Sequence, residues 1–160
     1  MRKLLIAALS AMIYLGAHFN TNEFTTHYTY TNRENIKVSS LIRPYFDHIV
    51  EGLIKAGVKI NLDQPISIQF EDEGNMPKGV IGIAKGMFDH QRVEIIINRS
   101  IWGSFNTIER YWVLIHEMGH DFWGKFHDGH GLMRPYHKYG ESKESLIAAV
   151  ERFVEELKEA

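Results

Sequence analysis

The chain of 160 residues contains no cysteine. This absence excludes disulfide scaffolds, zinc ribbons with cysteine ligands and catalysis by a thiol. An excess of charge of one sign is also absent, because 18 Lys and Arg residues are balanced by 20 Asp and Glu residues. Nucleic-acid binding requires a basic face, so we expect no nucleic-acid partner. The length and the hydrophobic content of 44% suit one domain with one core.

Long hydrophobic runs are nearly absent, and the longest mostly apolar stretch is residues 4–17, directly after Met1-Arg2-Lys3. A helix of that length spans roughly 21 Å, whereas a bilayer core is about 30 Å thick. A basic start, a short apolar stretch and a small-residue exit are typical of a secretory signal peptide. An amphipathic or buried helix and an uncleaved anchor are the alternatives. We predict a signal peptide at 1–17 and a secreted or periplasmic chain with no stable membrane span after cleavage.

The remaining chain divides into a flexible leader at 18–38, rich in Thr and Asn without any period, and one domain at 39–160. The hydrophobic patterns within this domain predict helices and strands in alternation. In order, we expect a helix over 39–56, a strand over 66–70, a loop over 71–79, an irregular edge strand over 80–84, a strand over 92–97, a helix over 107–123 and a closing helix over 143–158.

Local signals support several of these boundaries. Ser40 is the expected cap of the first helix, Pro44 lies in its first turn and Gly57 ends it. The apolar run at 92–97 predicts a strand that is buried on both faces. The glycines near 80–84 match no phosphate-binding loop and indicate bulges in an edge strand.

The helix predicted at 107–123 carries the chemistry. Asn106 and Glu109 have the spacing of a capping box, and Gly124 is the expected left-handed end. His116 and His120 lie four residues apart, so their side chains stack on one face of this helix. Two such imidazoles can bind one zinc ion at about 2.0–2.1 Å each. The alternative is that both histidines are ordinary surface residues.

Glu117 points about 100° away from its neighbour His116 on the helix. It is therefore too far round to be a third ligand, but it can reach a zinc-bound water as a general base. Gly119 also fits this arrangement, because a side chain there would crowd the helix against the sheet.

His116-Glu117-x-x-His120 followed by Gly124-x-x-His127 resembles the zinc site of the metzincin clan of peptidases. The resemblance implies that His116, His120 and His127 bind Zn2+ and that Glu117 is the general base. One departure is that three residues, not two, separate the second histidine from the glycine. This longer spacing resembles that of small exported bacterial zinc metallopeptidases.

The resemblance continues downstream, where Met133 is followed two residues later by Pro135, as in a Met-turn. The strand at 95–98 and the nearby Trp102 are also similar to those of the small exported peptidases. The implied fold class is α+β and zincin-like, with a small mixed sheet, an active-site helix, a Met-turn loop and a C-terminal helix. Met133 would then lie beneath the metal.

Alternative ligands remain open, because either His130 or Glu144 can replace His127 as the third. Glu144 more simply supplies negative charge to the first turn of the closing helix. Asp128 is either a residue that orients a ligand or an ordinary loop residue. Tyr136 and Tyr139, which follow the Met-turn, are expected to pack in the core. The remaining histidines are expected at the surface, namely His18, His27, His48, His90 and His137.

These observations predict a zinc-dependent metalloendopeptidase that hydrolyses peptide bonds in a peptide or protein substrate. By analogy with metzincins, the edge strand at 80–84 would border the cleft and accept an extended substrate as a further strand. The alternative is an exported zinc-binding interaction module without turnover. A closed structural site is less expected, because such sites normally have four protein ligands.

Overall fold

The computed structural model describes residues 33–87, 89, 91–129, 131–135 and 142–159. The predicted signal peptide and most of the predicted leader lie outside these residues. The elements are, in order, β1 (Ile36–Val38), α2 (Arg43–Lys55), β2 (Ile66–Glu71), the 3-10 helix η2 (Glu73–Asn75), β3 (Gly82–Ala84), β4 (Val93–Asn98), α3 (Arg99–Ser104), α4 (Thr107–Trp123), the 3-10 helix η3 (Gly131–Met133) and α5 (Lys143–Glu159).

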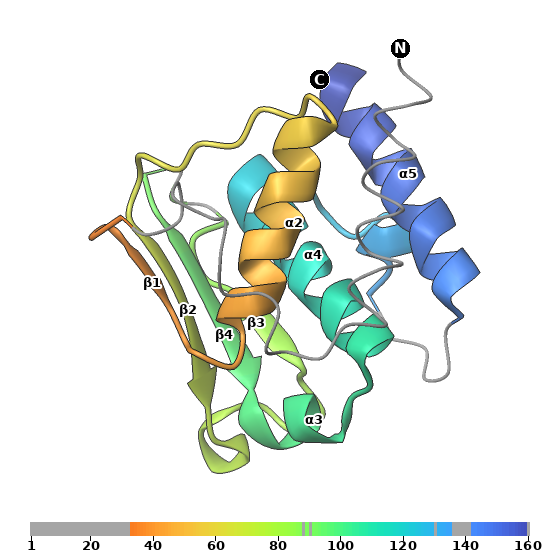
Figure 1. Ribbon diagram of the computed structural model, residues 1–160. Helices are drawn as coiled ribbons and strands as arrows, with labels where there is room; N and C mark the ends of the chain where they lie inside the picture. Colours follow the sequence, from red (N-terminus) through yellow and green to blue (C-terminus); the bar gives the residue numbers. More distant parts are fainter. Residues whose placement is uncertain (1–32, 88, 90, 130, 136–141, 160) are drawn as a thin grey trace.

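The four strands form one mixed sheet in the order β1-β2-β4-β3. The pairs β1–β2 and β2–β4 are parallel, whereas β3 is antiparallel to β4 and forms an edge, as predicted. Figure 1 shows α2, α4 and α5 on one side of this sheet, with α5 beyond α4. The protein is therefore a mixed α+β fold whose core lies between the sheet and the helices.

Strand β4 corrects one expectation. Its residues alternate, with Val93, Ile95 and Ile97 buried in the core and Glu94 and Ile96 only partly buried. The prediction that this strand is buried on both faces is wrong, because the helices of the described residues pack on one face of the sheet.

The start of α2 also differs from the prediction. The helix begins at Arg43, and its N-cap position is Ile42, which makes no side-chain cap. The backbone carbonyl of Ser39 accepts from the N–H groups of Ile42 and Arg43, so the preceding residues form a turn instead of a helix. The predicted cap by Ser40 is wrong. Gly57 ends the helix as predicted, with a φ of 84° that suits glycine.

His48 on α2 is a further correction, because it is 6% exposed and not a surface residue. His48 belongs to the buried face of α2 and faces α4, whereas Ile54 near the end of the helix is 42% exposed. Its Nδ1 lies 2.5 Å from the hydroxyl oxygen of the buried Tyr111. Burial lowers the pKa of His48 to about 4, so the ring is neutral at neutral pH.

Besides the two short 3-10 helices, one strand and one helix were not expected. Residues 36–38, the end of the predicted leader, form β1 and pair with β2. Helix α3 follows β4 directly, and the side-chain oxygen of Asn98 caps it by accepting from the N–H of Ile101 at 3.2 Å.

Helix α4 follows its prediction and occupies the centre of the fold. Its capping box of Asn106 and Glu109 is present, and Gly124 ends it with a φ of 60°. The helix contacts β3, β4, α2, η3 and α5. Helix α5 ends one residue beyond the predicted boundary. Within the described residues, no helix combines the length and the hydropathy needed to span a bilayer.

Candidate metal centre

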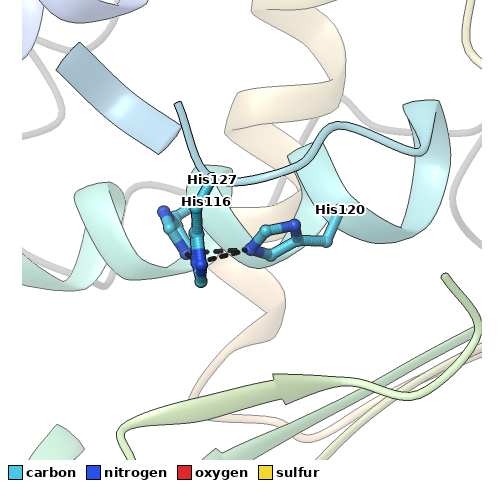
Figure 2. A group of neighbouring side chains, drawn as sticks. All are labelled: His116, His120 and His127. Carbon is cyan, nitrogen blue, oxygen red and sulfur yellow. Dashed lines mark hydrogen bonds between the residues drawn. The ribbon is translucent and has the colours of Figure 1, made fainter. Parts of the chain in front are cut away.

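Three histidine side chains converge beside the C-terminal half of α4. His116 and His120 lie one turn apart on the helix, and the left-handed turn at Gly124 reverses the chain so that His127 returns to them. Figure 2 shows the three rings pointing toward one another. The Nε2 atom of His120 lies 3.1 Å from that of His116 and 3.1 Å from that of His127, and the remaining Nε2 pair is 3.2 Å apart.

Backbone carbonyls orient two of these rings. The Nδ1–H of His116 donates to the carbonyl of Leu132 at 2.7 Å, and the Nδ1–H of His120 donates to the carbonyl of Lys125 at 2.5 Å. A carbonyl only accepts, so the proton of each neutral ring is on Nδ1 and the Nε2 lone pair faces its neighbours. Lone pairs this close repel one another unless a cation lies between them.

The protonation of the histidines agrees with this arrangement. Burial lowers the pKa of His116 to about 4, and burial also lowers the pKa of His120. The positive charge of Arg134 lowers the pKa of His116 further. Both rings are therefore neutral at neutral pH, which is the form of histidine that binds metals.

The spacing of the three nitrogens fits a metal ion. Ligands at about 2.0–2.1 Å in tetrahedral geometry are separated by roughly 3.3 Å from one another. The observed separations of 3.1–3.2 Å are close to this value. The three histidines could therefore hold a metal ion. Imidazole donors suit zinc, copper, iron and nickel, and a set of three leaves further coordination positions for water or a substrate.

A cleft of about 700 Å³ opens at this cluster. One wall consists of residues 78–84, which include β3, and the floor is the side of α4 that carries His116 and Glu117. Phe126, Arg134 and other residues that follow α4 complete the lining. The candidate metal site thus lies beside the edge strand of the sheet.

Glu117 lies in this cleft and is 7% exposed. It faces β3 at Gly82, where a Cβ atom would lie only 2.5 Å from Oε1 of Glu117. Burial raises the pKa of Glu117 to about 8, and repulsion by Asp121 raises it further. The absence of a side chain at Gly82 therefore gives this carboxylate its space.

Asp121 lies next to the cleft and influences Glu117, which was not predicted from the sequence. Its Oδ2 atom accepts from the N–H of Glu94 at 2.7 Å, which ties α4 to β4. Burial raises the pKa of Asp121 to about 6. Hydrogen bonds from the backbone of Glu94 and Gly86 lower this pKa and so offset part of the effect of burial. Its position four residues after Glu117, on the same helix face, is the signal that could have identified it.

Met133 packs against α4 between the positions of His116 and His120. A Cβ atom at Gly119 would lie 2.6 Å from Sδ of Met133 and 3.1 Å from Cζ of Phe153 on α5. Gly119 is therefore needed for the approach of Met133 and Phe153. The expected reason, that a side chain there would crowd the sheet, is wrong, because this face of α4 points away from the sheet.

The alternative site residues lie elsewhere. Glu144 is exposed in the first turn of α5 and does not belong to the histidine cluster. Asp128 is exposed, and the ring N–H groups of His116 and His120 donate to the carbonyls of Leu132 and Lys125 and not to this carboxylate. The predictions for His130, Tyr136 and Tyr139 fall outside the described residues, as do those for His18, His27, His90 and His137.

Comparisons with family models, with curated proteins and with solved structures give no match to this chain. The function is therefore inferred from the residues of the site and from their geometry.

Proposed function

We propose that this chain is a zinc-dependent metalloendopeptidase that hydrolyses peptide bonds in a peptide or protein substrate. The observation that carries the proposal is the convergence of three Nε2 atoms within 3.1–3.2 Å in the same cleft as the buried carboxylate of Glu117. The resemblance of the motif to metzincins supports zinc as the metal, and the packing of Met133 against α4 agrees with a zincin-like arrangement.

Zinc, when bound, supplies Lewis acidity that polarises a carbonyl and favours ionisation of water. Glu117 takes the proton from the attacking water and passes it to the leaving amine. Its pKa of about 8 belongs to the carboxylate without a cation nearby. A positive charge at the histidines stabilises the ionised carboxylate and lowers this pKa, so that Glu117 can accept a proton at neutral pH.

The substrate lies along the outer edge of β3. This strand forms one edge of the sheet and borders the cleft. An extended peptide added at this edge gains main-chain hydrogen bonds, which hold its backbone near the histidines without requiring particular side chains.

Replacement of Glu117 by glutamine tests the proposal. We expect Glu117→Gln to retain zinc, measured by elemental analysis, and to cleave fluorescently labelled casein at least 100-fold more slowly than the wild type. Glu144→Gln is the matched control, because it makes the same change at an exposed position outside the cleft. Equal cleavage by Glu117→Gln and wild type would contradict the proposal. Zinc binding without any cleavage by the wild type would indicate instead an exported zinc-binding interaction module.

Export is part of the same proposal and has its own test. If residues 1–17 are a signal peptide, the chain recovered from outside the cytoplasm begins at His18. Sequencing of the N-terminus of that chain checks this, and recovery of the full chain only from the cytoplasm would contradict it.

A further inference from the structure

The charged side chains of the cleft are unevenly distributed. Among the described residues that line it, Lys78 and Arg134 are the cationic Lys and Arg side chains, and Glu117 is the one carboxylate. That carboxylate is 7% exposed and faces β3. A divalent ion at the histidines would add further positive charge, so the cleft favours an anionic ligand.

Both cations lie toward the same end of the cleft. Gly82 faces Glu117 and Gly86 faces Asp121, so β3 and the turn after it run in the same direction as α4. Lys78 precedes β3, which places it toward the N-terminal half of α4. The guanidinium of Arg134 lies over the ring of Trp112 in that same half, 4.3 Å from the ring centroid.

The other end of the cleft has a different character. Met87 follows the contact between Gly86 and Asp121, and Phe126 follows the C-terminal end of α4. Phe126 is 69% exposed. The cleft is therefore cationic on one side of the histidines and apolar on the other.

Arg134 is suited to bind a carboxylate. Its stacking on Trp112 restrains the side chain before a ligand binds, so less conformational freedom about its rotatable bonds is lost on binding. A guanidinium presents its N–H donors in its own plane, where they match the two oxygens of a carboxylate. Lys78 contributes a second positive charge from the wall formed by residues 78–84.

We propose that the cleft selects peptides with a carboxylate within about three residues of the scissile bond, on one side of that bond only. The carboxylate is the side chain of Asp or Glu or the C-terminal carboxylate of a short peptide. Trp112 precedes the midpoint of His116 and His120 by six positions, or about 9 Å along the helix at about 1.5 Å per residue. An extended peptide covers that distance in about three residues. This specificity depends on the proposed peptidase activity.

Matched peptides test the inference. A peptide with one Glu is compared with the same peptide carrying Gln, with the Glu placed in turn at each of three positions on either side of the cleaved bond. We expect kcat/KM to be about 10- to 100-fold higher for Glu, at positions on one side only. A short peptide ending in a free carboxylate, compared with its amide, distinguishes the C-terminal source from the side-chain source.

Variants connect the preference to the two cations. We expect Arg134→Gln to remove most of the preference for Glu and Arg134→Glu to transfer it to peptides with Lys at the same position. Lys78→Gln should reduce the preference by a smaller factor. Lys37→Gln is the control, because it removes the same charge from the exposed position on β1, outside the cleft lining, and should leave the preference intact. Thermal unfolding checks that each variant folds. If Arg134→Gln does not fold, Arg134→Lys is used in its place, because it retains the positive charge.

A binding measurement separates this inference from the proposed function. Fluorescence polarisation of labelled Glu and Gln peptides on zinc-loaded Glu117→Gln reports cleft preference without turnover. Tighter binding of the Glu peptide, lost in the double variant with Arg134→Gln, supports recognition of a carboxylate in the cleft even if the wild type cleaves nothing. Equal binding of the two peptides, or cleavage with no preference for Glu, overturns the inference. Cleavage with no preference for Glu still supports the proposed peptidase activity.

Discussion

Replacing Gly82 with alanine tests the role of Glu117 without removing its carboxylate. A Cβ atom at Gly82 would lie 2.5 Å from Oε1, 2.7 Å from Cδ and 2.8 Å from Cγ of Glu117, whereas ordinary contacts begin at 3.4 Å. The side chain or the strand must therefore move by the difference between 3.4 and 2.5 Å, about 0.9 Å. The overpacking also costs about 1–3 kcal/mol of folding free energy.

The expected effect on activity is larger than the effect on stability. A displacement of about 1 Å in a catalytic group lowers the rate by roughly 100-fold. We therefore expect Gly82→Ala to reduce kcat on labelled casein by about that factor. The histidines make no contact with the added methyl among the three nearest atoms, so zinc content should stay at the wild-type level.

The control for this experiment is Gly74→Ala. A Cβ atom at Gly74 meets nothing within 4 Å, and its φ is not positive, so the same substitution is accommodated there. Activity, zinc content and melting temperature are measured together for both variants. Wild-type kcat in a folded, zinc-loaded Gly82→Ala protein would refute the reasoning that the space at Gly82 positions Glu117 for catalysis. Loss of zinc in that variant would refute the expectation that a displacement of Glu117 leaves zinc binding by the histidines unchanged.

Three further predictions concern stability. Because the pKa of His48 is about 4 in the folded chain and 6.5 ordinarily, the unfolded chain binds more protons below pH 6.5. The contribution of His48 to stability should therefore fall as the pH falls from 6.5 toward 4, by about 2 kcal/mol at pH 5. Because the pKa values of His116, Glu117 and Asp121 are also shifted, urea unfolding with a chelator present is compared between two proteins, and the wild type should lose about 2 kcal/mol more than His48→Leu between neutral pH and pH 5. Removing a metal present at 1,000 times its Kd should cost about 4 kcal/mol and lower Tm by roughly 10 °C, and an unchanged Tm in EDTA would contradict a metal site. Asn106→Ala removes the cap of α4 and should cost about 1 kcal/mol in urea unfolding, with a Tm decrease of roughly 2–4 °C; no loss would show that the cap adds nothing to the packed helix.

The helix with the histidines could be predicted from sequence because its signals are local. The capping box of Asn106 and Glu109, the apolar stripe and the left-handed Gly124 all lie within or beside the helix itself. The same holds for α5, whose apolar residues recur along one segment. In each case, the interactions that define the element join residues close in the chain.

The features that were missed depend on distant residues. Strand β1 exists through pairing with β2, which lies about 30 positions later, so its three residues carry no pattern of their own. The burial of His48 follows from its contact with Tyr111, on another helix. The ring orientation of His116 and His120 depends on backbone carbonyls, which every residue type has, so no sequence signal could identify Leu132 and Lys125 as partners.

The three histidines lie within twelve consecutive residues, whereas the walls of the cleft come from residues 78–84 and 134–135. Closing a loop this short costs little chain entropy, so a metal ion can be captured before the distant segments have packed. Metal binding at these histidines can therefore precede formation of the cleft during folding. A partly folded chain can carry its full complement of metal and still lack a substrate groove, so bound metal does not by itself indicate a competent enzyme.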